Sequence, residues 1–255
     1  MTFKHACHEL VDRAVQCVLS SSDRLPTYYG GRVIWPTRST WPSVYWSYEP
    51  HMARALRQFL RQGSVFWDIG ANVGWFSLFA SSLVGPSGVV EAFEPSPDVF
   101  QALRSNLENR ANARTHNVGI GDTDEIREFS AQGMSPGASF VEEVTKINAH
   151  YFPSDQIERI SVASTRLDTF MTASHNHPDL LKIDVEGYEY RALSGAERLL
   201  DAYRPAILIE IHPPQLKLSG GSEAGIFDLL RAHRYRWITL HKNQNSLYTI
   251  LATRD

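Results

Sequence analysis

The stretch SVFWDIGANVGWF (residues 64–76) decides the fold class, because an apolar strand pattern runs through a glycine-containing turn into a helix pattern. The strand pattern reaches Asp68, two glycines follow at Gly70 and Gly74, and the helix is expected over Trp75–Leu83. In folds built from such strand–turn–helix units, ligands bind beyond the carboxyl ends of the parallel strands. This turn is therefore the first place to look for a binding site.

The same alternation of strand and helix patterns continues through the rest of the chain. Strand patterns recur at 88–95, 114–120, 157–163, 179–184 and 205–211, and helix patterns at 52–63, 96–110, 166–172, 189–200 and 222–232. The final residues predict two more strands around a polar turn at Lys242–Asn245. This alternation predicts an α/β fold with a mostly parallel sheet and helices on both faces.

Residues 1–50 differ from residues 51–255 and are predicted to form an N-terminal extension to the main domain. The extension begins with a helix pattern up to about residue 24. Its second half, 25–50, is rich in proline, glycine and aromatic residues, which favours short strands and turns. The aromatic rings could pack the extension onto the sheet, line an acceptor pocket or form the contact of a homodimer, and packing is the use we expect.

Residues 131–156 are expected to form a long connection without regular structure. Long loops of this kind often act as lids or binding segments. His150 and Tyr151 are the candidate acceptor contacts there, with exposure on the surface as the default interpretation.

The composition is that of an ordinary globular protein. The 255 residues carry a net charge of −3, which gives no electrostatic footprint for a nucleic acid partner. The only two cysteines are Cys7 and Cys17, and no Asn-x-Ser/Thr acceptor occurs. An oxidising compartment is therefore not indicated, and no apolar run is long enough to span a membrane. We expect a cytoplasmic protein without a membrane partner.

The glycine turn excludes two common nucleotide sites. A dinucleotide-binding turn requires Gly-x-Gly-x-x-Gly, but Asn72 takes the place of the second glycine and Trp75 that of the third. A Walker loop is also excluded, because no Gly-Lys-Ser/Thr follows. The remaining spacing suits a ligand with an amino-acid end. Gly70 and Gly74 would allow its close approach, and Asp68 would order the loop or attract an ammonium group.

The second strand adds an acidic residue at the spacing expected for ribose recognition. Glu94 ends this strand, twenty residues after Gly74. A carboxylate at that point is placed to accept hydrogen bonds from both ribose hydroxyls. Ribose and an amino-acid tail together describe S-adenosylmethionine.

At this point the chain resembles the FkbM family of class I S-adenosylmethionine-dependent methyltransferases. The motifs that carry the resemblance include FWDIGANVGWFSLFA (66–80), NVGIGD (117–122) and DLLKIDVEGYEYRALSGAERLL (179–200), and it extends over Glu49–Pro213. The resemblance implies a Rossmann-like fold with a seven-stranded sheet, S-adenosylmethionine as donor, and methylation of a hydroxyl on a sugar, a glycoside or another natural product. Gly119 departs from the alanine usual in the family, near the expected adenine edge.

The resemblance and the spacing together give a set of candidate donor-binding residues. They come from the ends of the first two strands, from the motif at 117–122 and from the strand end at 184: Asp68, Gly70, Ala71, Asn72, Gly74, Glu94, Pro95, Ser96, Asn117, Gly119 and Asp184.

A cluster of charges follows the apolar run at 180–181 and suggests the catalytic residues. Asp184 ends one strand, while Glu210 and His212 end the next and share a face because they are two residues apart. We expect these three side chains to converge on the acceptor. Lys182 would neutralise Asp184 or anchor an anionic acceptor, and Glu186 continues the same face. Glu189 is expected to begin the next helix, where a carboxylate suits the positive end of the helix dipole.

Two mechanisms fit these residues. His212 or a carboxylate takes the hydroxyl proton directly, or Asp184 and Glu210 bind a divalent cation such as Mg²⁺ that polarises the hydroxyl. We favour proton transfer without a metal. The rival functions are N-methylation on the same scaffold and donor binding without catalysis. A nucleotide-dependent oxidoreductase is contradicted by Asn72 and Trp75.

Overall fold

The computed structural model describes residues 24–26, 32–34, 49–131, 133, 137–149, 157–243 and 246–254. Two short strands of the extension, β1 (Arg24–Pro26) and β2 (Arg32–Ile34), pair antiparallel, as the sequence predicts for this part of the chain. Several predictions fall outside the described residues. They concern the helix predicted for the start of the chain, both cysteines, the aromatic residues between 28 and 48, and His150 and Tyr151.

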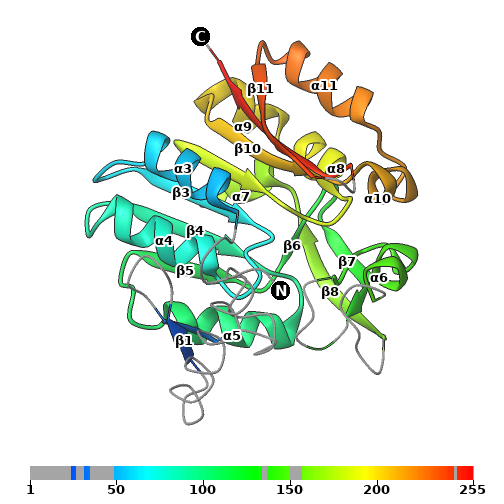
Figure 1. Cartoon of the computed structure of the whole chain (residues 1–255), viewed down its shortest axis with the longest axis horizontal. Helices are drawn as coiled ribbons and strands as arrows, with labels where there is room; N and C mark the ends of the chain where they lie inside the picture. The colour runs from blue at the N-terminus through cyan, green and yellow to red at the C-terminus, as the bar shows by residue number, and fades with distance from the viewer. Residues whose placement is uncertain are drawn as a thin grey trace, which may run out of the picture.

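The core of the fold is a seven-stranded sheet in the order β11-β12-β10-β9-β3-β4-β5 (Figure 1). Its strands are β3 (Val65–Ile69), β4 (Val89–Phe93), β5 (Ala113–His116), β9 (Leu180–Ile183), β10 (Ala206–Ile211), β11 (Arg236–Lys242) and β12 (Tyr248–Thr253). Strands β5, β4, β3, β9 and β10 are parallel, and β12 pairs antiparallel with both β10 and β11. The predicted mostly parallel sheet is confirmed.

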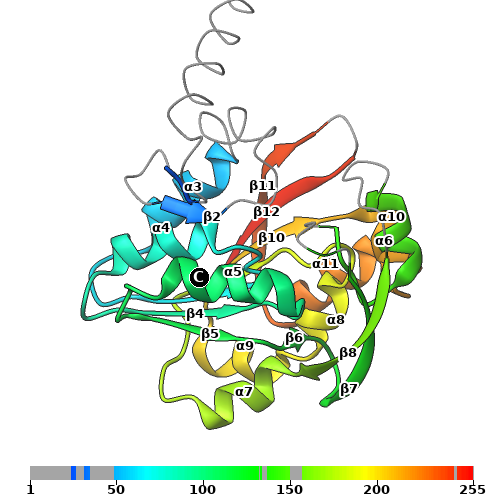
Figure 2. The ribbon, with the colours of Figure 1, turned by 90° about the horizontal axis from the view of Figure 1, so that it is seen from below.

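Helices cover both faces of this sheet. Figure 2 shows α3 (Pro50–Phe59), α4 (Trp75–Val84) and α5 (Pro97–Leu107) on one side, and α7 (Leu167–Ala173) and α9 (Glu197–Tyr203) on the other. Neighbouring strand residues point to opposite faces, so each strand contributes to two separate cores. Strands buried on both faces consist of almost continuous apolar runs, and this is why the sequence pattern identified them.

Part of the chain departs from the predicted pattern between the fifth and the ninth strand. The expected strand at 114–120 is two strands, because the chain leaves the main sheet after β5 and forms β6 (Gly119–Ile120) in a second sheet. Between them, Asn117 Nδ2 donates hydrogen bonds to the carbonyl oxygens of Glu94 and Pro95 and fixes this turn. The second sheet has the order β6-β8-β7, with β7 at Glu125–Ala131 and β8 at Glu158–Thr165.

The helices differ from the prediction at three places. The expected long loop contains a helix, α6 (Glu142–Ala149), and another, α10 (Pro213–Leu218), starts directly after β10. The expected helix at 189–200 is divided into α8 (Glu189–Ser194) and α9 by Gly195. A Cβ at Gly195 would lie 2.0 Å from the carbonyl oxygen of Gly121, so this break permits a close backbone contact with the second sheet. The last helix, α11 (Glu223–Ala232), lies where the sequence predicts it.

The topology places a site between β3 and β9. From β3 the chain proceeds through β4 to β5 on one side, whereas β9 and β10 lie on the other side. The carboxyl ends of β3 and β9 therefore meet at a topological switch point, where α/β folds bind ligands.

Among the described residues, no helix combines the length and apolar composition needed to cross a bilayer.

Candidate functional site

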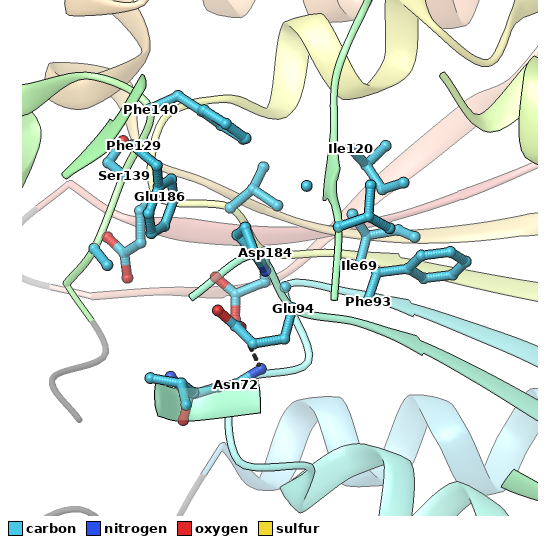
Figure 3. Close-up of a pocket in the computed structure, with 17 residues that line it drawn as sticks. Ile69, Asn72, Phe93, Glu94, Ile120, Phe129, Ser139, Phe140, Asp184 and Glu186 are labelled. Atoms are coloured by element: carbon cyan, nitrogen blue, oxygen red, sulfur yellow. Dashed lines mark hydrogen bonds between the residues drawn. The ribbon is translucent and has the colours of Figure 1, made fainter. Parts of the chain in front are cut away.

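A pocket opens at this switch point. Its walls come from the turn after β3, the end of β4, residues 118–120, the segment before α6, and the residues after β9 (Figure 3). Figure 3 shows Glu94 and Asp184 in the middle of the pocket, Phe140 and Glu186 toward one side, and Ile120 on the other.

The two glycines of the first turn accommodate the protein's own chain. Gly70 has a φ of +74°, and a Cβ there would lie 1.8 Å from the carbonyl oxygen of Asp184. Gly74 has a φ of +87°, and its Cβ would lie 2.7 Å from Leu103 Cδ1 on α5. Such left-handed conformations favour glycine. From the sequence we expect these glycines to allow a ligand to approach closely. The structure adds a packing reason, since Gly70 brings the turn after β3 against the end of β9.

Asn72 connects the turn to the candidate ribose-binding residue. Its φ of 50° is left-handed, a conformation that asparagine tolerates better than most residues, and its Oδ1 accepts a hydrogen bond from the N–H of Val73 at 2.8 Å. The N–H of Asn72 donates to Glu94 Oε2 at 3.0 Å, and the N–H of Ser96 donates to Glu94 Oε1 at 2.9 Å. The Glu94 carboxylate is thus fixed at the pocket wall. Burial raises its pKa to about 7, although these two hydrogen bonds act to lower it.

Asp68 and Lys182 form a buried ion pair behind the turn. Lys182 Nζ lies 3.1 Å from Asp68 Oδ1, donates to the carbonyl oxygen of Gly70 at 3.2 Å, and lies 3.4 Å from Asp184 Oδ2. The second oxygen of Asp68 accepts a hydrogen bond from Ser77 Oγ. Burial acts to lower the pKa of Lys182, but Asp68 and Asp184 raise it above its ordinary value. The lysine therefore pairs with the carboxylates of Asp68 and Asp184 and is not among the residues that line the pocket.

Asp184, Glu210 and His212 come together as the strand pattern predicts. Their potential ligand atoms all lie within 4.8 Å of one another. The imidazole of His212 is buried, and its Nε2 lies 4.0 Å from Asp184 Oδ1 and 3.6 Å from Glu186 Oε2. Parallel pairing of β9 with β10 causes this convergence, because it brings the carboxyl ends of the two strands side by side.

Glu189 is a member of this cluster whose contact the sequence did not predict. It begins α8, as expected, but its buried carboxylate turns back toward β10. Glu189 Oε1 lies 2.7 Å from His212 Nδ1 and also accepts the N–H of Gly187 at 2.8 Å. A carboxylate at one imidazole nitrogen fixes the orientation of the ring and leaves the other nitrogen toward the pocket. The two residues are 23 positions apart, so no local pattern indicated their contact.

Glu49 is a second residue that sequence reasoning did not place in the site. It precedes α3, at the end of the predicted extension, and has a left-handed φ of 40°. The pKa of Glu49 is raised well above its usual range. Burial is the largest cause, and the charges of Glu210 and Asp184 come next. Its Oε2 is buried and has no hydrogen-bond partner among the described residues.

The cluster as a whole holds more carboxylates than cationic groups. Lys182 and His212 are surrounded by six acidic residues: Glu49, Asp68, Asp184, Glu186, Glu189 and Glu210. Burial, and then the charge of Asp184, raises the pKa of Glu210 to about 8. Burial would lower the pKa of His212, but Glu186 and Glu189 raise it well above its usual range. The cluster can therefore hold protons near neutral pH, and its charge favours a cation in the adjoining pocket.

The segment that contains α6 forms the remaining wall of the pocket. Ser139 and Phe140 line the pocket, and Ser139 pairs with Ser130 of β7 through two backbone hydrogen bonds. Asn148 of α6 is buried and donates from Nδ2 to Glu186 Oε2 at 3.1 Å. Burial raises the pKa of Glu186. The sequence predicts a lid or binding segment here, but without a clear helix pattern it indicated neither α6 nor the contact of Asn148 with Glu186.

The predicted site residues divide into those that line the pocket and those that support it. The lining residues among them are Gly70, Asn72, Glu94, Pro95, Gly119, Asp184 and Glu186. The others lie behind the pocket wall or beside it: Asp68, Ala71, Gly74, Ser96, Asn117, Lys182, Glu210 and His212.

Comparison with known proteins identifies the class of enzyme. The family model described as methyltransferase FkbM domain matches residues 68–237. A 31-O-demethyl-FK506 methyltransferase from Streptomyces tacrolimicus is 33% identical over 201 residues, which cover 69% of this chain and 74% of the relative. A hexuronic acid methyltransferase from Haloferax volcanii is 24% identical over 164 residues, or 64% of this chain and 62% of the relative.

A solved structure shares the fold. The crystal structure of methyltransferase FkbM from Methylobacillus flagellatus gives a TM-score of 0.50 at 16% identity and covers 85% of this chain. The match covers 53% of that protein, so the present chain spans about half of its length. Since the family model spans more than half of this chain and the Streptomyces relative is 33% identical, the chain belongs to the FkbM family of methyltransferases.

Proposed function

We propose that this methyltransferase transfers a methyl group from S-adenosylmethionine to a hydroxyl of a small metabolite such as a sugar, a glycoside or another natural product. The observation that carries the proposal is Glu94, whose carboxylate is fixed by two backbone N–H groups at the wall of the pocket. Each carboxylate oxygen has a further lone pair, so the pair of oxygens can accept hydrogen bonds from both hydroxyls of a ribose. The names of the two relatives, which give 31-O-demethyl-FK506 and hexuronic acid as the molecules methylated, support a small-molecule acceptor.

The pocket gives each part of the donor a matching environment. With the ribose at Glu94, the amino-acid tail lies against the turn at Gly70 and Asn72. The sulfonium then lies beside Asp184, where the excess of carboxylates stabilises its positive charge. In the reaction the acceptor oxygen bonds to the methyl carbon, the carbon–sulfur bond breaks with its electron pair going to sulfur, and the hydroxyl proton passes to the protein.

Glu186 is the proposed proton acceptor. It lines the pocket, and its raised pKa makes it a stronger base than an ordinary carboxylate. Asn148 and His212 lie at 3.1 and 3.6 Å from its Oε2 and orient it. Asp184 Oδ2 lies 3.4 Å from Lys182 Nζ, beside the proposed position of the sulfonium. Positioning of the reacting groups lowers the barrier by several kcal/mol, up to about 7–11 in well-oriented cases.

A divalent cation at Asp184, Glu210 and His212 is the alternative for activating the hydroxyl. These residues offer two carboxylates and one imidazole, whereas Mg²⁺ and Ca²⁺ prefer oxygen ligands, and Asp184 already has Lys182 as a cationic partner. We therefore retain proton transfer without a metal. We expect dialysis against EDTA to leave methyl transfer unchanged. A loss of activity that Mg²⁺ restores would favour the cation instead.

The first experiment is calorimetry with S-adenosylhomocysteine, followed by mass spectrometry of products from a panel of hydroxylated and amine acceptors. We expect binding, a large loss of affinity for Glu94→Ala, and a methyl ether as the product. A methylamine would show N-methylation on the same scaffold. Tight donor binding without product across the panel, with unchanged binding by Asp184→Ala, would indicate a binding protein without catalysis.

A further inference from the structure

We propose that Phe140, from the segment before α6, is a donor-binding residue that packs against the adenine ring, and that Gly119 is required to seat it. This inference rests on the proposed S-adenosylmethionine site and names a recognition residue that the strand ends do not supply. It is carried by the position of Phe140 in the pocket and by its contact with Gly119.

The direction of the donor across the sheet places the adenine near Gly119. The amino-acid tail belongs at the turn after β3, and the ribose belongs at Glu94, which ends the neighbouring strand β4. The next strand in the sheet is β5, and residues 118–120 follow it. These residues line the pocket with apolar surface, together with Val99 and Pro95. A purine has apolar faces, so this wall suits it better than the carboxylate side does.

Phe140 reaches this wall from another part of the chain. A Cβ added to Gly119 would lie 2.3 Å from Phe140 Cζ, whereas Pro95 Cβ would be 3.5 Å away. The end of the phenyl ring therefore occupies the space that any side chain at position 119 would need. In Figure 3 the ring of Phe140 points toward the interior of the pocket.

The ring is fixed from behind by other aromatic residues. Phe129 of β7 meets it edge-on at a centroid distance of 5.1 Å, and Tyr188 is tilted against it at 5.0 Å. The Arg127 guanidinium lies within 6 Å of both the Phe140 and the Tyr188 rings. A ring held in this way loses little conformational freedom on binding, which increases the net gain from stacking on a ligand.

Isothermal titration calorimetry with two ligands tests this assignment. S-adenosylhomocysteine contains the whole product nucleoside, and 5′-methylthioadenosine keeps the adenine but lacks the amino-acid tail. Removing a stacking ring costs binding affinity, so we expect Phe140→Ala to weaken both ligands by a similar factor, roughly tenfold. Phe227→Ala is the matched control, because Phe227 stacks on Trp237 at 4.7 Å and is not a pocket residue. It should leave both affinities unchanged.

A double-mutant cycle tests whether the Phe140 ring requires the space beside Gly119. We expect Gly119→Ala to weaken both ligands, because its Cβ displaces the ring. In the Phe140→Leu background, where Cζ is absent, Gly119→Ala should cost less affinity than it does in the wild type, so the two changes are not additive. Circular dichroism checks that each variant is folded. If Phe140→Ala does not fold, Phe140→Leu takes its place in the calorimetry.

The results separate this inference from the proposed function. If the wild-type protein binds neither ligand, the donor site itself is wrong. If the wild type binds both and Phe140→Ala or Phe140→Leu binds them within twofold of wild type, the donor site stands and the adenine contact is refuted. A loss for S-adenosylhomocysteine alone would also refute it, because Phe140 would then contact the amino-acid end.

Discussion

Glu94 shows how one buried carboxylate can make ligand binding depend on pH. Its pKa is raised from 4.5 to about 7 mainly by burial. The folded protein therefore binds more protons than the unfolded chain between pH 4.5 and 7, and the stability contributed by this group falls as pH rises through that window. In the proposed donor site we expect the ionised form to accept the two ribose hydroxyl hydrogen bonds. Binding and stability should therefore respond to pH in opposite directions.

We predict that the affinity for S-adenosylhomocysteine decreases as pH falls below 7, approaching about tenfold for each pH unit if one proton is involved. Calorimetry between pH 5.5 and 8 measures this dependence. Glu94→Gln keeps the size of the side chain but cannot ionise, so it should bind weakly at every pH. An equally steep decrease in that variant would assign the proton to another group.

Glu189 fixes the imidazole of His212 from the side opposite the pocket. We predict that Glu189→Gln lowers the pKa of His212, because a negative charge that raises it is removed. The change also weakens a buried charged hydrogen bond and should lower the free energy of unfolding by about 1–3 kcal/mol. Histidine resonances in an NMR pH titration and a urea denaturation curve measure the two effects. Glu197→Gln, on the exposed surface of α9, should change neither.

At the scale of elements, the break between α8 and α9 is set by a tertiary contact. Gly195 has a φ of −82°, which any residue can adopt, so its backbone conformation does not require glycine. The contact with the Gly121 carbonyl oxygen does require it. We predict that Gly195→Ala lowers the free energy of unfolding by about 1–3 kcal/mol through overpacking. Ala202→Ser, exposed on α9, should stay within about 0.5 kcal/mol of the wild type in the same urea denaturation.

The α6 segment shows a second element whose role depends on its neighbours. Its helix pattern is short, and its buried face of Val144, Thr145 and Asn148 mixes apolar with polar residues. The helix is nevertheless in contact with the cluster of carboxylates around His212, because Asn148 donates to Glu186. An element of this kind is specified by what it packs against more than by its own periodicity.

At the scale of the whole molecule, the pocket joins the two sheets and the segment before α6. A ligand that binds only the folded state stabilises all of these parts together. We predict that S-adenosylhomocysteine at 100 times its Kd stabilises the fold by about 2.7 kcal/mol, and that the melting temperature rises by roughly 5–10 °C. A thermal-shift assay measures this change. NAD is the control and should give no shift, since the glycine turn lacks the dinucleotide pattern. A larger shift with NAD would contradict the donor assignment.

The sequence by itself determined the α/β alternation, the mostly parallel sheet, the turn after β3 and the convergence of Asp184, Glu210 and His212. These features depend on short periodic patterns and on the rule that parallel strands end at one edge, so local sequence is sufficient to predict them. The expected role of Glu94 rests on the same kind of spacing, and the structure places its carboxylate at the pocket wall.

Only the tertiary structure decided which side chains surround these groups. Glu189 reaches His212 across 23 residues, Glu49 enters the cluster from the end of the extension, and Phe140 meets Gly119 from the segment before α6. None of these contacts has a local signal, because the partners lie on different elements and the free energy that favours them comes from burial and charge in the assembled fold. Periodicity specifies the elements, whereas packing between distant residues specifies the chemistry of the pocket.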